Sequence, residues 1–155
     1  MQRTACKATL AALMIAVAPA VAWAEANIGV GKWVWNAKES HYTEGAYAKE
    51  QTMEIKRLDK DGISVLQNVT LVDGKNFTWS IESPFDDQIR HGSQWMSFAF
   101  TRISDTQFHD RYIMDADGKQ GEETFTIKGR KLILEGAAIV NGKKMPYVEV
   151  WDRVD

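Results

Sequence analysis

The chain has 155 residues, of which 19 are lysine or arginine and 21 are aspartate or glutamate, so its net charge is −2 at neutral pH. A chain of this length suits one domain with a modest hydrophobic core. The mildly acidic balance argues against nucleic acid and anionic membrane surfaces as partners, because both attract strongly basic proteins.

Residues 1–24 have the layout of a secretory signal peptide. Arg3 and Lys7 precede an apolar run over residues 9–21, and Ala22-Trp23-Ala24 provides the small residues of a cleavage site. The apolar run is shorter than the roughly 20 residues that cross a bilayer. We therefore expect a cleaved signal rather than a membrane anchor.

Cleavage after Ala24 or Ala26 leaves one mature domain over residues 25–155, with a net charge of −4 for the cut after Ala24. It also removes Cys6, the only cysteine, so the mature domain has neither disulfides nor thiol chemistry. No second apolar span follows. The sequence thus predicts a periplasmic or secreted protein without a membrane span, of undetermined oligomeric state.

Tight-turn signals recur along the mature chain and separate short runs of β-branched and aromatic residues. Asp-Gly and Asn-Gly pairs supply the positive φ angles of hairpin turns, as in Asp61-Gly62, Asp73-Gly74 and Asn141-Gly142. Nine strands are predicted over residues 31–36, 51–58, 63–72, 75–82, 94–102, 107–115, 121–127, 131–139 and 145–153. This spacing predicts an all-β fold, an antiparallel up-and-down meander closed into a barrel of about eight to nine strands. Residues 38–48 are predicted as a loop or short helical turn.

Alternation within these runs assigns side chains to two faces of the sheet. Val65 and Gln67 share a face in one strand, and Trp79 lies among apolar neighbours in the next. Asp110 and Tyr112 fall on the same face as two large apolar residues. An acid on an apolar face is costly unless it is paired, so Asp110 is expected at a polar spot in a cavity or at the barrel rim.

The start of the mature domain carries a recognisable pattern. Gly31-Lys32-Trp33 resembles the G-x-W of lipocalins and their calycin relatives, and Arg153 stands near the chain end. The resemblance implies a lipocalin-like barrel in which Trp33 plugs one end and Arg153 packs on its ring.

A longer resemblance is to secreted, mostly uncharacterised bacterial proteins that share a W-x-L-N-x-x-K-S-like start. Residues 33–42 follow that pattern, with Trp35 in place of leucine and Glu39 inserted before the serine. The end of the chain, residues 150–154, fits loosely. This resemblance implies the same barrel and carries no activity.

Tryptophan is abundant, and five tryptophans follow the signal. Aromatic residues in a barrel of this size fill the interior or line a cavity for one small ligand. The leading hypothesis is an exported protein that holds a small apolar or aromatic molecule inside the barrel; a solidly packed core is the alternative. The candidate ligand-binding residues are Gln67, Trp79, Trp95, Asp110, Tyr112 and Trp151.

Two other functions stay open. A cofactor-independent lyase, isomerase or hydrolase would use Asp110, Tyr112 and His91 as general acid–base residues. An envelope protein that binds a partner would use an exposed sheet face containing Met96, Phe98 and Phe100.

Common catalytic and cofactor motifs do not occur in the sequence. The three histidines, His41, His91 and His109, lack the spacing of metal ligands. No cofactor or metal is therefore expected.

Overall fold

The computed structural model describes residues 28–43, 47–92, 96–115 and 118–155. The proposed signal peptide and Trp95 lie outside these ranges, so both remain predictions from the sequence.

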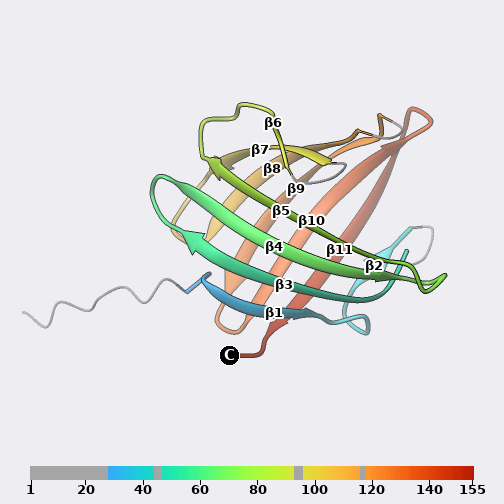
Figure 1. Cartoon of the computed structure of the whole chain (residues 1–155), viewed down its shortest axis with the longest axis horizontal. Coiled ribbons are helices and arrows are strands. Elements are labelled where there is room, and N and C mark those ends of the chain that lie inside the picture. Colours follow the sequence, from blue (N-terminus) through green and yellow to red (C-terminus); the bar gives the residue numbers. More distant parts are fainter. Residues whose placement is uncertain (1–27, 44–46, 93–95, 116–117) are drawn as a thin grey trace, which may run out of the picture.

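All nine predicted strands are present, and two strands of two residues each bring the total to eleven in the described part of the chain (Figure 1). The strands are β1 (Gly31–Trp35), β2 (His41–Tyr42), β3 (Ala48–Leu58), β4 (Gly62–Leu71), β5 (Asn76–Pro84), β6 (Arg90–His91), β7 (Met96–Arg102), β8 (Gln107–Met114), β9 (Gln120–Lys128), β10 (Lys131–Val140) and β11 (Lys143–Arg153). The expected count of eight to nine was too low because β2 and β6 are too short to show an alternating pattern. β2 lies in the segment that was predicted as a loop.

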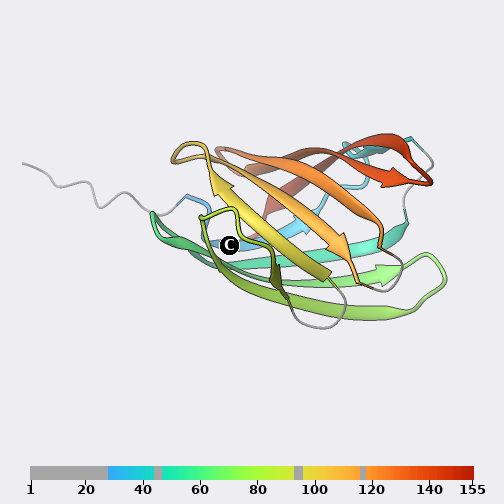
Figure 2. The same cartoon turned by 90° about the horizontal axis from the view of Figure 1, so that it is seen from above.

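The strands form one antiparallel sheet in the order β5-β4-β3-β1-β11-β10-β9-β8-β7-β6, with β2 pairing to β11. β1 pairs with both β3 and β11, which brings the first and last long strands together. The sheet curves into two facing layers, β3 to β5 below and β7 to β11 above in Figure 2, and β1 joins them. Across the remaining gap, Trp79 of β5 stacks on Phe98 of β7 with ring centroids 4.8 Å apart. The predicted barrel is thus confirmed and is nearly closed.

The hairpin between β10 and β11 shows why its sequence specifies a tight turn. Asn141 and Gly142 have φ angles of 51° and 74°. Two successive positive φ angles match the right-handed twist of the flanking strands, and asparagine and glycine adopt them at little cost.

One end of the barrel is solid, and Trp33 lies at its centre. Trp33 and Trp151 are completely buried. The Trp33 indole Nε1 donates a hydrogen bond to the Gly29 carbonyl at 3.2 Å. Arg153 Cζ lies 5.8 Å from the centre of the Trp33 ring, so the packing implied by the lipocalin resemblance is present.

Arg153 also ties the chain leading into β1 to the end of β11. Its guanidinium donates to the carbonyls of Ile28 at 2.9 Å and Val30 at 2.7 Å. This segment therefore covers the solid end of the barrel.

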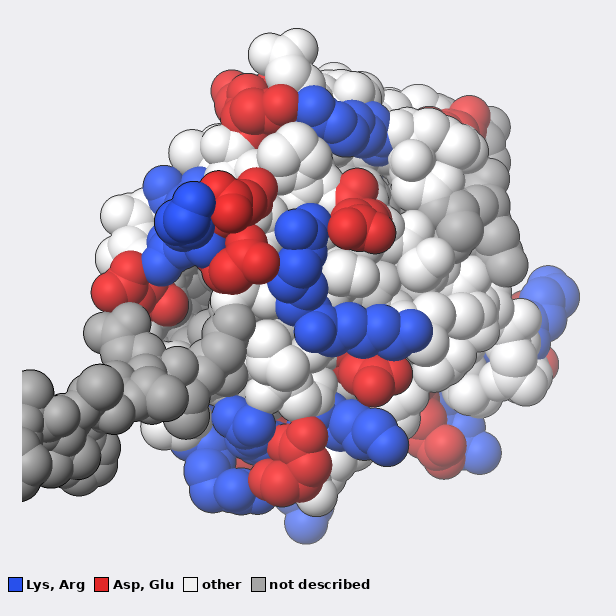
Figure 3. All heavy atoms as spheres, turned by 60° about the vertical axis from the view of Figure 1, so that its left-hand side comes forward, with Lys and Arg blue, Asp and Glu red and all other residues white. Residues whose placement is uncertain are grey.

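Lysine and arginine alternate with aspartate and glutamate over the face shown in Figure 3, without a broad field of one sign. Within the residues that the structure describes, no helix has the length and apolar character needed to span a membrane.

Candidate functional site

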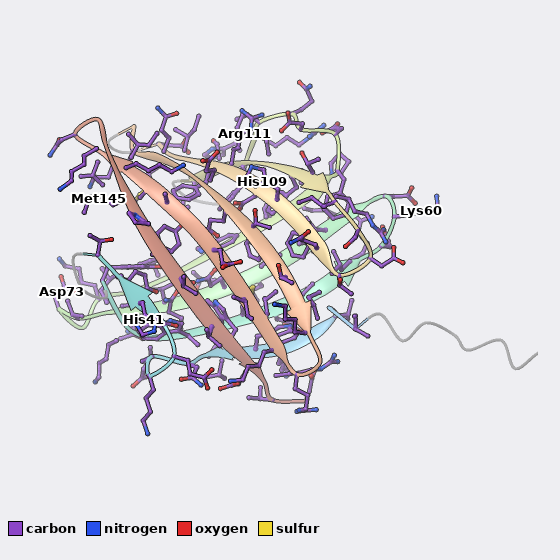
Figure 4. All side chains as sticks on the ribbon, turned by 180° about the vertical axis from the view of Figure 1, so that it is seen from behind. His41, Lys60, Asp73, His109, Arg111 and Met145 are labelled. Carbon is purple, nitrogen blue, oxygen red and sulfur yellow. The ribbon has the colours of Figure 1, made fainter. Side chains whose placement is uncertain are left out.

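The rest of the barrel interior contains a cavity of about 640 Å³. Its wall is mostly aliphatic and aromatic and includes residues from every long strand except β1. The cavity reaches Leu71, Val140 and Met145, which lie at the end of the barrel marked by Asp73 and Met145 in Figure 4. Lys60 marks the opposite end in the same view. The cavity is thus a deep pocket above a solid floor.

Polar groups in the cavity lie in one transverse row across five strands. Strand register places Asp110 opposite Glu123, Glu123 opposite Gly136, Gly136 opposite Tyr147, and Tyr147 opposite Tyr42. The backbone ladders of β8, β9, β10, β11 and β2 therefore fix the positions of all these side chains.

Two glycines make this row possible by leaving space for bulky neighbours. A Cβ atom on Gly136 would lie 2.8 Å from Glu123 Cγ and 3.1 Å from the Tyr147 hydroxyl. A Cβ atom on Gly121 would lie 2.4 Å from the Tyr112 ring. Because neither glycine has a side chain, the two tyrosines lean across β9 and β10 and meet inside the cavity.

The row continues as a hydrogen-bonded network. The Tyr147 hydroxyl donates to Glu123 Oε1 and lies 3.3 Å from the Tyr112 hydroxyl. The rings of Tyr42 and Tyr147 stack with centroids 5.9 Å apart.

Glu149 is the next inward-facing residue after Tyr147 on β11, toward Trp151. It accepts hydrogen bonds from the Tyr42 hydroxyl at 2.5 Å and from Trp151 Nε1 at 3.1 Å. Both of its carboxylate oxygens therefore have protein donors.

Gln67 completes the polar part of the wall and is bonded to the buried Gln51. Gln67 Nε2 donates to Gln51 Oε1 at 2.7 Å, and the Tyr47 hydroxyl lies 3.3 Å from the same oxygen. The Gln67 amide is thus hydrogen-bonded to Gln51 rather than left unpaired in an apolar wall.

Burial determines the protonation of the three carboxyl groups. Burial, and then the nearby charge of Glu149, raises the pKa of Glu123 to about 8, against a hydrogen bond from Tyr147 that favours the charged form. Burial and the charge of Glu123 raise the pKa of Asp110 well above its ordinary value. Burial also raises the pKa of Glu149, although its hydrogen-bond donors oppose the shift. The cluster therefore holds protons near neutral pH.

Four of the six predicted ligand-binding residues line the cavity: Gln67, Trp79, Asp110 and Tyr112. The prediction for Trp151 was wrong, because this residue lies one inward position deeper on β11 than Glu149 and packs into the solid end. Trp95 lies outside the described residues.

His91 does not lie with Asp110 and Tyr112, so the prediction of a catalytic set was wrong for His91. The His91 side chain is 64% exposed, and its Nδ1 lies 2.9 Å from Asp115 Oδ2. The loop acids nearby are bound to other partners, since Asp86 pairs with Arg90 at 2.6 Å.

His41 and His109 lie on separate strands, far apart in the view of Figure 4. Among the described residues, no group of three histidine, cysteine, aspartate or glutamate side chains is placed to hold a metal ion.

The face containing Met96, Phe98 and Phe100 is not an exposed patch. Phe98 and Phe100 are only 3% and 2% exposed, and all three residues line the cavity. The prediction that this face binds a partner was wrong because β7 directs these residues inward.

Glu123 and Tyr147 were missed as site residues. A usable signal was present, since Glu123 has the same strand parity as Phe125 and Ile127, and Tyr147 has that of Trp151. This parity alone shows that Glu123 turns inward and that the adjacent Glu122 turns outward.

No protein-family model and no curated protein matches this chain. Solved structures do match. The wild-type fluorescent protein UnaG is 15% identical, covers 81% of this chain and 97% of its own, and superposes with a TM-score of 0.55. A Schistosoma mansoni fatty acid binding protein in complex with arachidonic acid is 13% identical, with coverage of 84% and 98% and a TM-score of 0.54.

Secretory abundant heat soluble protein 4 from Ramazzottius varieornatus is 11% identical, with coverage of 83% and 96% and a TM-score of 0.52. At identities this low the similarity concerns the fold. The barrel is similar in fold to that of the fatty acid binding protein, and a specifically lipocalin barrel stays a prediction.

Proposed function

We propose that this protein binds a small, mainly apolar molecule inside its barrel. The observation that carries the proposal is the cavity of about 640 Å³, with an apolar and aromatic wall and a few convergent polar groups. Cavities of about 300–1,000 Å³ with this composition are typical of small-molecule sites. The similarity to a fatty acid binding protein in complex with arachidonic acid supports the same use of the fold.

The first test is titration with Nile red, an uncharged fluorescent dye that responds to apolar surroundings. Ala138 faces the cavity, whereas the next residue on β10, Ile139, is 42% exposed on the outer surface. Ala138→Trp fills the cavity and is expected to weaken dye binding about tenfold or more, a loss of about 1.4 kcal/mol. Ile139→Trp adds an indole to the same strand outside the cavity and leaves binding unchanged. Equal effects of the two variants would place the dye elsewhere and contradict the proposal.

Native mass spectrometry of the protein purified from its own source addresses the same cavity without a chosen dye. A copurifying small molecule that disappears in the Ala138→Trp variant is the expected result. The mass of that molecule identifies its chemical class.

A second candidate function is favoured by the Asp110–Glu123 carboxyl pair. A buried carboxyl group with a pKa of about 8 is suited to proton transfer near neutral pH, as in a cofactor-independent lyase, isomerase or hydrolase. Incubation with the copurified molecule tests this candidate. Conversion that is lost in Glu123→Gln while binding persists supports an enzyme, and recovery of the unchanged molecule supports a binding protein.

Export is part of the proposal and is supported by the signal-like pattern in residues 1–24. N-terminal sequencing of the protein from the periplasm or medium is expected to begin at residue 25 or 27. A chain that retains residue 1 would contradict export by cleavage.

A further inference from the structure

The carboxyl groups inside the cavity have no basic side chain among them. Asp110, Glu123 and Glu149 all line it. Of the described residues in the wall, Lys119 is the only lysine or arginine, and its side chain is exposed at the rim. The interior is therefore a site of acceptor groups without a buried cation.

Asp110 is the least satisfied of the three acids. It is 2% exposed, and no hydrogen-bond partner reaches its Oδ1 atom among the described residues. Buried polar atoms are normally paired, and an unpaired one calls for an explanation such as a ligand. Its cross-strand neighbour Glu123 has the Tyr147 donor on Oε1, whereas Glu149 has donors on both oxygens. The free acceptor capacity thus lies at Asp110 and Glu123.

We propose that the cavity's ligand is an amphiphilic organic amine, whose ammonium group binds between Asp110 and Glu123 and whose apolar part fills the rest of the cavity. This inference rests on the proposed binding function and specifies its ligand class. An ammonium group brings several donors and a positive charge, which match the unpaired Asp110 oxygen and the second carboxyl group once one of these acids releases its proton. An anionic ligand such as a fatty acid brings no donor for the unpaired Asp110 oxygen, and its charge would oppose ionisation of the three acids.

The aromatic wall suits the same class of ligand. Phe98 stacks on Phe100 at 5.8 Å, Phe108 stacks on Phe125 at 4.6 Å, and all four rings line the cavity. Aromatic faces attract ammonium groups and pack against alkyl or aryl chains. A bare metal ion would leave this apolar volume unfilled.

Amine binding is coupled to proton release. The titratable side chains that face the Asp110–Glu123 pair inside the barrel are Glu149 and the tyrosines Tyr47, Tyr112 and Tyr147. Because burial keeps protons on the acids of the empty cavity, an incoming ammonium group ionises at least one of them. Affinity for an amine should therefore rise with pH through the pKa of Glu123, about 8, and fall once the free amine loses its own proton, near pH 10.

The test is displacement of Nile red by three decyl compounds with different head groups: decylamine, decan-1-ol and decanoate. Near neutral pH, decylamine is expected to bind about tenfold more tightly than decan-1-ol, and decanoate more weakly than decan-1-ol. Asp110→Asn and Glu123→Gln keep the side-chain shape and remove the charge. Each should bring decylamine to within about twofold of decan-1-ol, because the alcohol needs no carboxylate.

Glu122→Gln is the matched control, since Glu122 is adjacent to Glu123 but lies outside and pairs with Lys144 at 2.8 Å. It should preserve the preference for the amine. Unchanged binding of decan-1-ol shows that a variant is folded. If one of the two cavity variants does not bind the alcohol, the amine preference is judged from the other variant.

The possible failures are distinguishable. If Nile red binds in the cavity but decanoate equals or exceeds decylamine, the ligand class is wrong and the binding function stands. If none of the four compounds binds, both proposals are overturned. An amine preference that survives both cavity variants also overturns the inference, because the charge that recognises the amine would then lie elsewhere.

Discussion

The two halves of the barrel are built from the same strands and have very different interiors. On β11, the inward face passes from Trp151 at the solid end to Glu149 and Tyr147 in the cavity. On β9 it passes from Ile127 to Glu123 and then to Gly121. Large apolar side chains thus give way to acids and glycines along one face. Alternation therefore determines which residues turn inward, and the size and polarity of successive inward residues determine whether the interior is solid or hollow.

Removal of Trp33 should produce the largest loss of stability at the solid end. Trp33→Ala deletes a completely buried ring and is expected to lower the free energy of unfolding by about 3–5 kcal/mol. Trp79→Ala removes a half-buried ring from the cavity wall and should cost about 1–2 kcal/mol, because a partly exposed ring loses fewer contacts than a completely buried one. Urea denaturation measures both. Equal losses would mean that the two halves are packed alike.

The pH dependence of stability should arise in the cavity. The pKa of Glu123 is raised from 4.5 to about 8, so between these values the folded chain binds more protons than the unfolded chain. This contribution to stability is complete below about pH 4.5 and is lost as pH rises through about 8. We expect a loss of about 3 kcal/mol between about pH 5 and about pH 9, since one pKa unit corresponds to about 1.4 kcal/mol and water in the cavity offsets part of the burial.

Urea titrations across that pH range test this expectation. Glu123→Gln should reduce the slope of the stability profile and leave the part that Asp110 and Glu149 contribute, whereas Trp33→Ala should lower the profile without changing its slope. Surface acids with lowered pKa values, such as Asp86 and Asp152, act in the opposite sense and only at more acidic pH. A stability that rises between pH 5 and pH 9 would contradict the assignment of a protonated cluster.

A substitution at Gly136 should lower the stability less than Trp33→Ala does, but it should also disturb the hydrogen-bonded row in the cavity. A Cβ atom there would lie 2.7 Å from the Glu122 carbonyl oxygen, so the backbone or the Tyr147 hydroxyl must move. Gly136→Ala should cost about 1–2 kcal/mol and should shift the titration of Glu123, followed by carboxyl infrared or NMR signals. Glu135→Ala, at an exposed neighbouring position on the same strand, should change neither. If the titration of Glu123 is unchanged in Gly136→Ala, Gly136 does not contribute to the hydrogen-bonded network.

Arg153 should have the smallest effect. Arg153→Ala removes the contact with the Trp33 ring and two hydrogen bonds to backbone carbonyls, and we expect a loss of about 1 kcal/mol. The Nile red affinity should stay unchanged, because Arg153 lies at the solid end. Weaker dye binding without a change in stability would show that the two ends are coupled.

The sequence was informative where a pattern repeats. Asn141-Gly142 located a hairpin, and the alternation through Phe108, Asp110 and Tyr112 placed an acid on the inward face. The resemblance at Gly31-Lys32-Trp33 implied the contact with Arg153, which is present.

Other parts of the site depend on strand register, which no local pattern contains. Glu123 and Tyr147 meet because Gly136 is opposite both. His91 was predicted to lie with Asp110 because the sequence of a loop does not show where a side chain points. In the structure His91 is exposed, pairs with Asp115 and does not line the cavity. Trp151 was assigned to the cavity because aromatic content alone does not reveal depth along the barrel axis.

The row from Asp110 to Tyr42 has a consequence for the kinetics and entropy of binding. Each member is held by backbone ladders on neighbouring strands rather than by a loop. A head group that enters the barrel thus meets dipoles already oriented, and little conformational freedom is lost when it binds. The empty and occupied barrels should superpose closely at these five positions, and exchange of the ligand should depend on motion at the rim rather than on rearrangement of the polar row.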